Sequence, residues 1–112
     1  MAVEHLDTEA LDELKEVMEE EFESLIHTFV VDSEKKLMAL RAAIDSKDED
    51  MVGKVGHSFK GSCSNIGALH LTDLCKKVED KGRANDLSGI NELYVLVKEE
   101  YSIVKHALND LI

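Results

Sequence analysis

Apolar residues recur along most of this chain every three or four positions, the repeat that places them on one face of an α-helix. The longest such stripe consists of Phe22, Ile26, Phe29, Ser33, Leu37, Leu40 and Ile44. The spacing predicts helices over about residues 8–16, 19–45, 48–66, 68–83 and 87–110. Because the connections are short, successive helices are expected to lie antiparallel. The sequence therefore predicts an all-α fold, an antiparallel up-down four-helix bundle with a short additional N-terminal helix.

Polar residues and glycines mark the expected helix ends. The run from Ser46 to Glu49 matches a capping box for the helix over 48–66. Gly67 is expected to end that helix in a left-handed conformation. Asp86 or Ser88 is expected to cap the last helix. These signals support helix boundaries close to those that the apolar pattern predicts.

Composition and charge narrow the function classes. The chain has 112 residues, of which 44% are apolar, so we expect one folded domain over residues 1–112. No apolar run is long enough to cross a membrane, and the N-terminus does not resemble a signal peptide, so the protein is expected to be cytoplasmic. Its 24 acidic and 13 basic residues give a net charge of −11, which argues against nucleic acid or anionic lipid as a partner. Cys63 and Cys75 are expected to be reduced and buried.

One group of turn-spaced residues stands on a single face of the helix predicted over residues 48–66. Its members are Gly53, Lys54, His57, Lys60, Gly61 and Ser64. The opposite face carries Val52, Val55, Phe59, Ser62, Cys63 and Ile66. This arrangement buries one stripe and points His57 at solvent. Glycine inside a helix costs about 1 kcal/mol relative to alanine, so glycines around an exposed imidazole indicate a candidate site.

The charge near His57 differs from that of the rest of the chain. From residue 51 to residue 72 there is no acidic residue, while Lys54 and Lys60 are present. The sequence thus predicts a neutral-to-positive patch around the histidine, suited to a group that carries an anion. The other histidines form no metal-binding or catalytic pattern with the acids or cysteines, so no metal site is predicted.

The run from His57 to Ala68 resembles the signature of histidine-containing phosphotransfer (Hpt) domains, His-x-x-Lys-Gly-Ser followed after four residues by Gly-Ala. The likeness extends to Leu71, Leu74, Cys75 and Glu79 downstream and to Phe29 and Leu37 upstream. The likeness covers nearly the whole chain, which is similar to the standalone bacterial type of this family. Gly56 departs from the pattern, because the family usually has alanine there; the departure is expected to soften the helix without altering the chemistry.

The resemblance implies that His57 is phosphorylated on Nε2 by a receiver-domain aspartyl phosphate and passes the phosphoryl group to another receiver aspartate. Imidazole suits this role because it is largely neutral and nucleophilic near neutral pH. Lys60 would stabilise the phosphoryl oxygens, with Lys54 as a weaker partner. Gly53 and Gly61 would let the receiver approach, and Ser64 would help to orient the imidazole or the phosphate. The chain itself would need no cofactor, since Mg²⁺ is expected in the receiver, and it would be a carrier without turnover of its own.

The expected partners are the receiver domain of a hybrid sensor histidine kinase and that of a response regulator. A chain that starts at Met1 and ends with the last helix favours a separate protein, and a monomer is expected because the helices suffice for a closed bundle. Two other function classes remain open. A non-catalytic adaptor bundle would bind a signalling partner without chemistry. A histidine-dependent hydrolase or kinase has less support, because the chain has no nucleotide-binding glycine loop and no nucleophile elbow.

Overall fold

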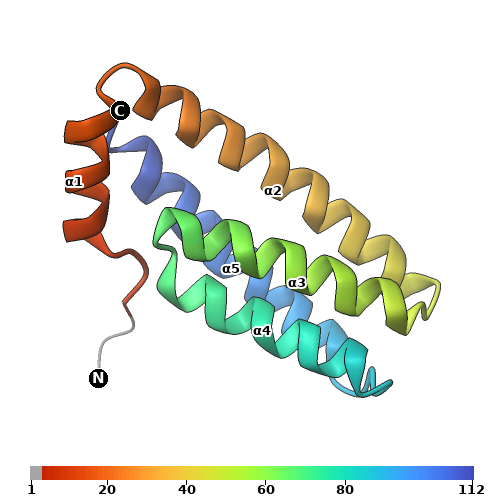
Figure 1. The fold of residues 1–112 in the computed structure, drawn as a ribbon. Helices are drawn as coiled ribbons and strands as arrows, with labels where there is room; N and C mark the ends of the chain where they lie inside the picture. The colour runs from red at the N-terminus through yellow and green to blue at the C-terminus, as the bar shows by residue number, and fades with distance from the viewer. Residues whose placement is uncertain (1–3) are drawn as a thin grey trace.

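The computed structural model describes residues 4–112; the predicted domain limits also include residues 1–3, which lie outside the described part. Over the described residues the fold is all-α, as predicted (Figure 1). The helices are α1 (Thr8–Met18), α2 (Glu21–Asp45), α3 (Glu49–Ile66), α4 (Leu69–Arg83) and α5 (Ile90–Asn109). Each begins and ends within about three residues of the limits that the apolar pattern indicates.

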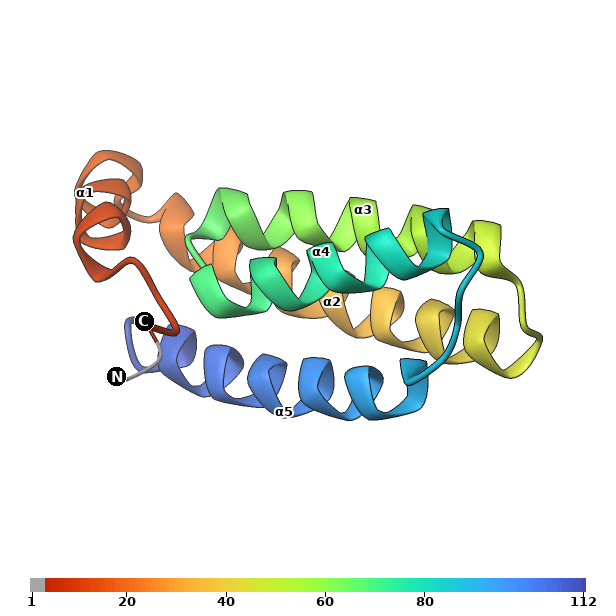
Figure 2. The same ribbon diagram turned by 90° about the horizontal axis from the view of Figure 1, so that it is seen from below.

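Helices α2 to α5 form an up-down bundle in which each helix runs antiparallel to the one before it (Figures 1 and 2). Helix α1 lies across one end of this bundle, beside the start of α2 and the C-terminus (Figure 1). Lys15 Nζ of α1 donates a hydrogen bond of 2.7 Å to the Leu111 carbonyl, and the Asp7 amide donates to the Gly67 carbonyl at 2.8 Å. The short N-terminal helix therefore closes the end of the bundle where the α3–α4 turn lies.

The core is the predicted one. All seven residues of the α2 stripe are buried, as are Val52, Val55, Phe59, Cys63 and Ile66 on α3. Ser62 was expected on the same buried face but is only half-buried. Cys63 and Cys75 are free thiols in the core, as expected. Among residues 4–112, no helix combines the length and apolar composition that a bilayer-spanning segment requires.

The helix caps correct part of the sequence interpretation. Gly67 ends α3 in the left-handed conformation, with φ of 75°, as predicted. The capping box is wrong: Asp48 is the N-cap of α3 and accepts a 3.1 Å hydrogen bond from the Met51 amide, whereas the Ser46 hydroxyl donates back to α2. The predicted cap of α5 is also wrong, because Gly89, with φ of 71°, occupies that position. A left-handed glycine leads the chain into the helix there without any side-chain cap.

Glycines allow α3 and α4 to pack closely against each other. A Cβ added to Gly82 would lie 2.2 Å from the Gly53 nitrogen, and one added to Gly56 would lie 2.6 Å from the Glu79 nitrogen. Neither position has room for a side chain. Gly56 therefore does more than soften its helix: it lets the backbone of α4 approach α3 at Glu79, directly beneath the predicted site.

Candidate functional site

His57 lies in the middle of α3 on the outer surface of the bundle. Its side chain is 61% exposed, so the exposure predicted from the helical pattern is confirmed. The core stripe of α3 holds the helix in this rotation, with Val52 and Phe59 almost fully buried on the far side. The imidazole can therefore be reached by a macromolecular partner without any rearrangement of the fold.

A buried carboxylate from the next helix contacts the ring. Glu79 of α4 is only 3% exposed, and its Oε2 lies 2.9 Å from His57 Nδ1. Two cations bind the same carboxylate: Lys60 Nζ lies 2.7 Å from Oε1, and Arg83 Nη2 lies 2.6 Å from Oε2. Burial alone would disfavour the charged form of Glu79, but each of its oxygens has a cationic partner.

The protonation state of Glu79 decides which nitrogen of His57 is free. The hydrogen bond from Lys60 does most to hold the pKa of Glu79 below its usual value; burial opposes this, and His57 and Arg83 add to the lowering. Glu79 is therefore ionised at neutral pH and can only accept hydrogen bonds. The proton of a neutral imidazole must then sit on Nδ1, so the lone pair of Nε2 is left facing solvent.

Lys60 differs from the exposed cation that the helical pattern indicated. Its side chain is 29% exposed, and its ammonium group is engaged by Glu79. Arg83 is more open, with 65% of its side chain exposed. The two cations lie on different oxygens of one carboxylate, and Arg83 shares its oxygen with the histidine ring.

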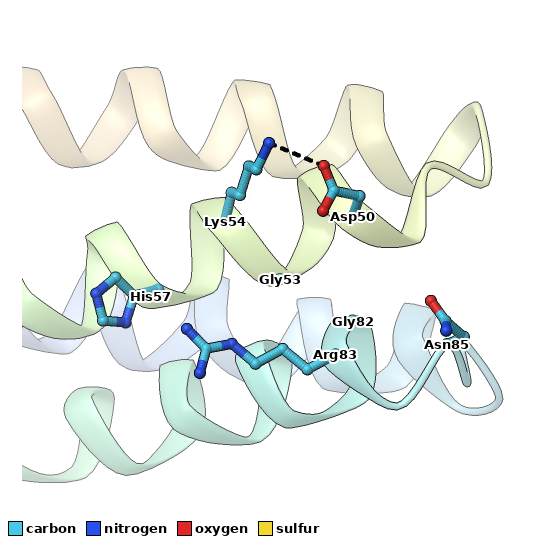
Figure 3. A pocket seen from close by; sticks show the side chains of 7 residues that line it. All are labelled: Asp50, Gly53, Lys54, His57, Gly82, Arg83 and Asn85. Carbon is cyan, nitrogen blue, oxygen red and sulfur yellow. Dashed lines mark ion pairs between the residues drawn. The ribbon is translucent and has the colours of Figure 1, made fainter.

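A hollow of about 450 Å³ adjoins His57 on the side of Arg83 (Figure 3). Its lining includes Gly53 of α3 and Gly82 of α4. Lys54 lies at its rim and pairs with Asp50 at 2.9 Å, so its charge is partly neutralised (Figure 3). One ring nitrogen of His57 faces Arg83 and the other faces away from it (Figure 3).

The other predicted site residues fall into two groups. Gly61 is exposed, and an added Cβ would meet no atom within 4 Å, so nothing in the fold requires glycine at this position. Gly53 is buried against Gly82, but an added Cβ at position 53 would lie 3.5 Å from its nearest neighbours, an ordinary contact distance; its part in docking stays a prediction. Ser64 is exposed, and Glu79 contacts the imidazole; a part for Ser64 in orienting the ring or the phosphate stays a prediction.

The absence of acidic residues from the segment around His57 does not predict the charge around this residue in the folded protein. Residues 51–72 contain no acidic residue, but the fold brings Glu79 against the ring from 22 positions away. Glu79 and Arg83 were not identified as charged site residues. Their spacing of four does predict an ion pair within a helix, yet only the register of α4 against α3 places that pair at His57.

Within residues 4–112, no group of three or more His, Cys, Asp or Glu side chains is arranged to hold a metal ion. The sequence profile of the Hpt domain matches residues 24–107, which span α3 and α4 completely. The chain belongs to the Hpt domain family. His57 of this Hpt domain lies near the middle of the matched segment.

Two known proteins are similar to this Hpt domain. The crystal structure of histidine-containing phosphotransfer protein B (HptB) from Pseudomonas aeruginosa PAO1 superposes with a TM-score of 0.92 at 38% identity, covering 97% of this chain and 95% of that one. Multistep phosphorelay regulator 1 of Schizosaccharomyces pombe is 24% identical over 92 residues. Those residues are 81% of this chain but 31% of that protein, so the chain spans less than a third of this relative.

Proposed function

We propose that this protein is a phosphoryl carrier of a multistep phosphorelay, phosphorylated on His57 Nε2. The observation that carries the proposal is the buried Glu79 carboxylate 2.9 Å from Nδ1, because it leaves Nε2 unprotonated and facing solvent. Membership of the Hpt domain family and the likeness to a phosphorelay regulator support the same function. An adaptor that only binds would have no need of an oriented imidazole.

The first half-reaction loads the carrier. The Nε2 lone pair of His57 attacks the phosphorus of an aspartyl phosphate on a receiver domain. The Nε2–P bond forms, the Asp O–P bond breaks, and its electron pair leaves with the aspartate carboxylate. Because Nδ1 keeps its proton, the phosphorylated ring carries a positive charge, which the Glu79 carboxylate stabilises at hydrogen-bond distance.

The second half-reaction reverses these changes toward another receiver. Its aspartate attacks the phosphorus, the Nε2–P bond breaks, and the electron pair returns to the ring. With Nδ1 still protonated, the leaving group is neutral imidazole, whereas a deprotonated ring would have to leave as an anion. The same hydrogen bond to Glu79 therefore assists transfer in both directions.

The residues around His57 have separate parts in this proposal. Lys60 holds Glu79 and lends positive charge to the phosphoryl oxygens. Gly61 leaves open space one turn from the ring for the approach of a receiver. Lys54 adds a weaker positive field because Asp50 already pairs with it. A Mg²⁺ ion, where the reaction uses one, is bound by the acidic residues of the receiver.

The partners that we propose are the receiver domains of a hybrid sensor histidine kinase and of a response regulator, met in the cytoplasm. The carrier would have no turnover without them. Each encounter is expected to be transient and to bury a modest area, since the same face must dock a donor and then an acceptor.

The proposal is tested by mixing the protein with a phosphorylated receiver domain. We expect label on this chain that is stable in alkali and labile in acid, and no label on a His57→Gln variant. Persistent labelling of the variant would remove the site assignment. Receiver binding without any labelling of the unaltered protein would favour the adaptor instead.

A further inference from the structure

Arg83 and the His57 ring share one oxygen atom. Glu79 Oε2 accepts a hydrogen bond from His57 Nδ1 at 2.9 Å and forms an ion pair with Arg83 Nη2 at 2.6 Å, while Lys60 binds the other oxygen, Oε1. The positive charge of Arg83 beside Oε2 offsets part of the negative charge that this oxygen presents to the ring. The guanidinium is thus placed to adjust how strongly Glu79 stabilises charge on His57.

The charged groups facing the ring come from two helices. On α3 they are Lys60 and Lys54, the latter paired with Asp50; on α4 they are Glu79 and Arg83. Lys60 is half-buried and fixed, whereas Arg83 is largely exposed on the wall of the hollow beside the ring. Arg83 can therefore change its contact without opening the interface between the helices.

We propose that Arg83 is a positioning residue that acts through Glu79 to set how long the phosphoryl group stays on His57. The inference rests on the proposed function. A ring protonated at Nδ1 loses its phosphoryl group readily, because the leaving group is then neutral imidazole. A Glu79 carboxylate at its full negative charge favours that protonated ring. By neutralising part of this charge, Arg83 lowers the fraction of the phosphorylated ring that is protonated at a given pH, and so lengthens the lifetime of the phosphorylated carrier.

The test is the rate of phosphoryl loss from the phosphorylated protein, without any receiver, measured over a series of pH values. Arg83→Ala is compared with Arg83→Lys, which keeps the charge, and with Lys76→Ala as a matched control. Lys76 is likewise an exposed cation of α4 in an i,i+4 ion pair, with Asp80, but it does not contact Glu79. We expect Arg83→Ala to move the pH profile upward by roughly half a unit, or about threefold faster loss on its alkaline side. Arg83→Lys and Lys76→Ala should stay near the unaltered profile.

Two results would overturn the inference. If Arg83→Ala changes the rate by the same factor at every pH, Arg83 acts on the phosphoryl group itself rather than through Glu79. If its profile matches that of Lys76→Ala, Arg83 has no influence on the ring. A double variant sharpens the distinction: in a Glu79→Gln background, Arg83→Ala should cause no further shift. Failure to label His57 in the unaltered protein would instead refute the proposed function, so the two failures are distinct.

Discussion

The two nitrogens of the His57 imidazole have different surroundings, and this difference organises the chemistry at the residue scale. Nδ1 meets a buried carboxylate, while the ring as a whole is 61% exposed. A helix that only displayed a histidine would leave its tautomer free to vary. The ion pairs of Lys60 and Arg83 keep Glu79 ionised and in place, so one nitrogen carries the proton and the other remains a nucleophile.

Substitution of Glu79 tests this assignment at the level of one atom pair. Glu79→Gln keeps the shape of the side chain but removes the charge that stabilises the phosphorylated ring. Because a hydrogen bond to a charged group contributes about 1.5–3 kcal/mol, we expect phosphoryl transfer to slow by about 10- to 100-fold. Rapid-quench measurements with one receiver would give the rate. Transfer by the variant at the unaltered rate would show that Glu79 has no part in the reaction.

Gly61 can be examined in the same way, because the fold leaves space around it. Gly61→Gln adds a side chain where a Cβ would meet no atom within 4 Å. We expect stability to stay equal or rise by about 0.5–1 kcal/mol, since glutamine favours the helix more than glycine, while receiver binding weakens. Gly82→Ala is the contrasting variant: its Cβ would lie 2.2 Å from Gly53, so it should lower stability. A loss of stability in Gly61→Gln with unchanged binding would contradict the docking role.

Helical spacing predicts which residues share the exposed face of His57, but it does not predict which residues another helix brings to the ring. The exposure of His57 follows from helical spacing alone. The partner of Lys60, in contrast, is set by the register between α3 and α4, which depends on the close contact at Gly56. No pattern within residues 51–72 specifies that register, so the acid-free segment suggested more positive charge than the folded site has.

At the scale of helices, the packing of α3 on α4 determines where the site lies. The glycines at positions 56 and 82 bring the two backbones together. The contact at Gly56 places Glu79 under the imidazole. Helix α2 packs on the opposite flank of α3, where Lys36 of α2 donates to the Ser62 hydroxyl at 2.7 Å. The helix that carries His57 is thus held on both sides while its outer face stays open.

The start of α3 offers a prediction that also tests the corrected cap. Asp48→Ala removes the side chain that accepts from the Met51 amide, so we expect a loss of about 1 kcal/mol in the free energy of unfolding. Ser46→Ala is the matched control, because its hydroxyl bonds back to α2 and does not cap α3. Urea denaturation followed by circular dichroism would measure both. If Ser46→Ala lowered stability more than Asp48→Ala, the result would support Ser46 as the cap, as the sequence predicts.

The elements themselves were largely predictable, and their exact ends were not. Seven core positions of α2 follow one another by three and four, which is a strong signal over so long a helix. Helix ends depend on competing local hydrogen bonds, and Asp48 and Ser46 are equally plausible caps until the path of the preceding turn is known. The N-cap of α5 is Gly89, which has a left-handed backbone conformation and no side-chain cap, so no capping side chain in the sequence marks this helix start.

On the scale of the whole molecule, the ionisation of Glu79 should make the stability of the fold depend on pH. Glu79 has a lowered pKa in the folded protein, so its ionised form stabilises the fold above the pKa of an unfolded glutamate, about 4.3. That contribution is lost as pH falls below this value and through the folded-state pKa. We therefore expect the stability difference between the unaltered protein and Glu79→Gln to be positive at pH 7 and to shrink at pH 3.5. A difference that is the same at both pH values would contradict the ionised Glu79.

The most direct test of the account is a nitrogen NMR spectrum of the protein labelled with ¹⁵N-histidine, recorded before and after phosphorylation. Before the reaction, we predict that the neutral His57 ring carries its proton on Nδ1, facing Glu79. After the reaction, Nε2 should show coupling to phosphorus while Nδ1 keeps its proton. A His57 ring protonated on Nε2 at the start, or phosphorus bonded to Nδ1 or to another residue at the end, would contradict the account.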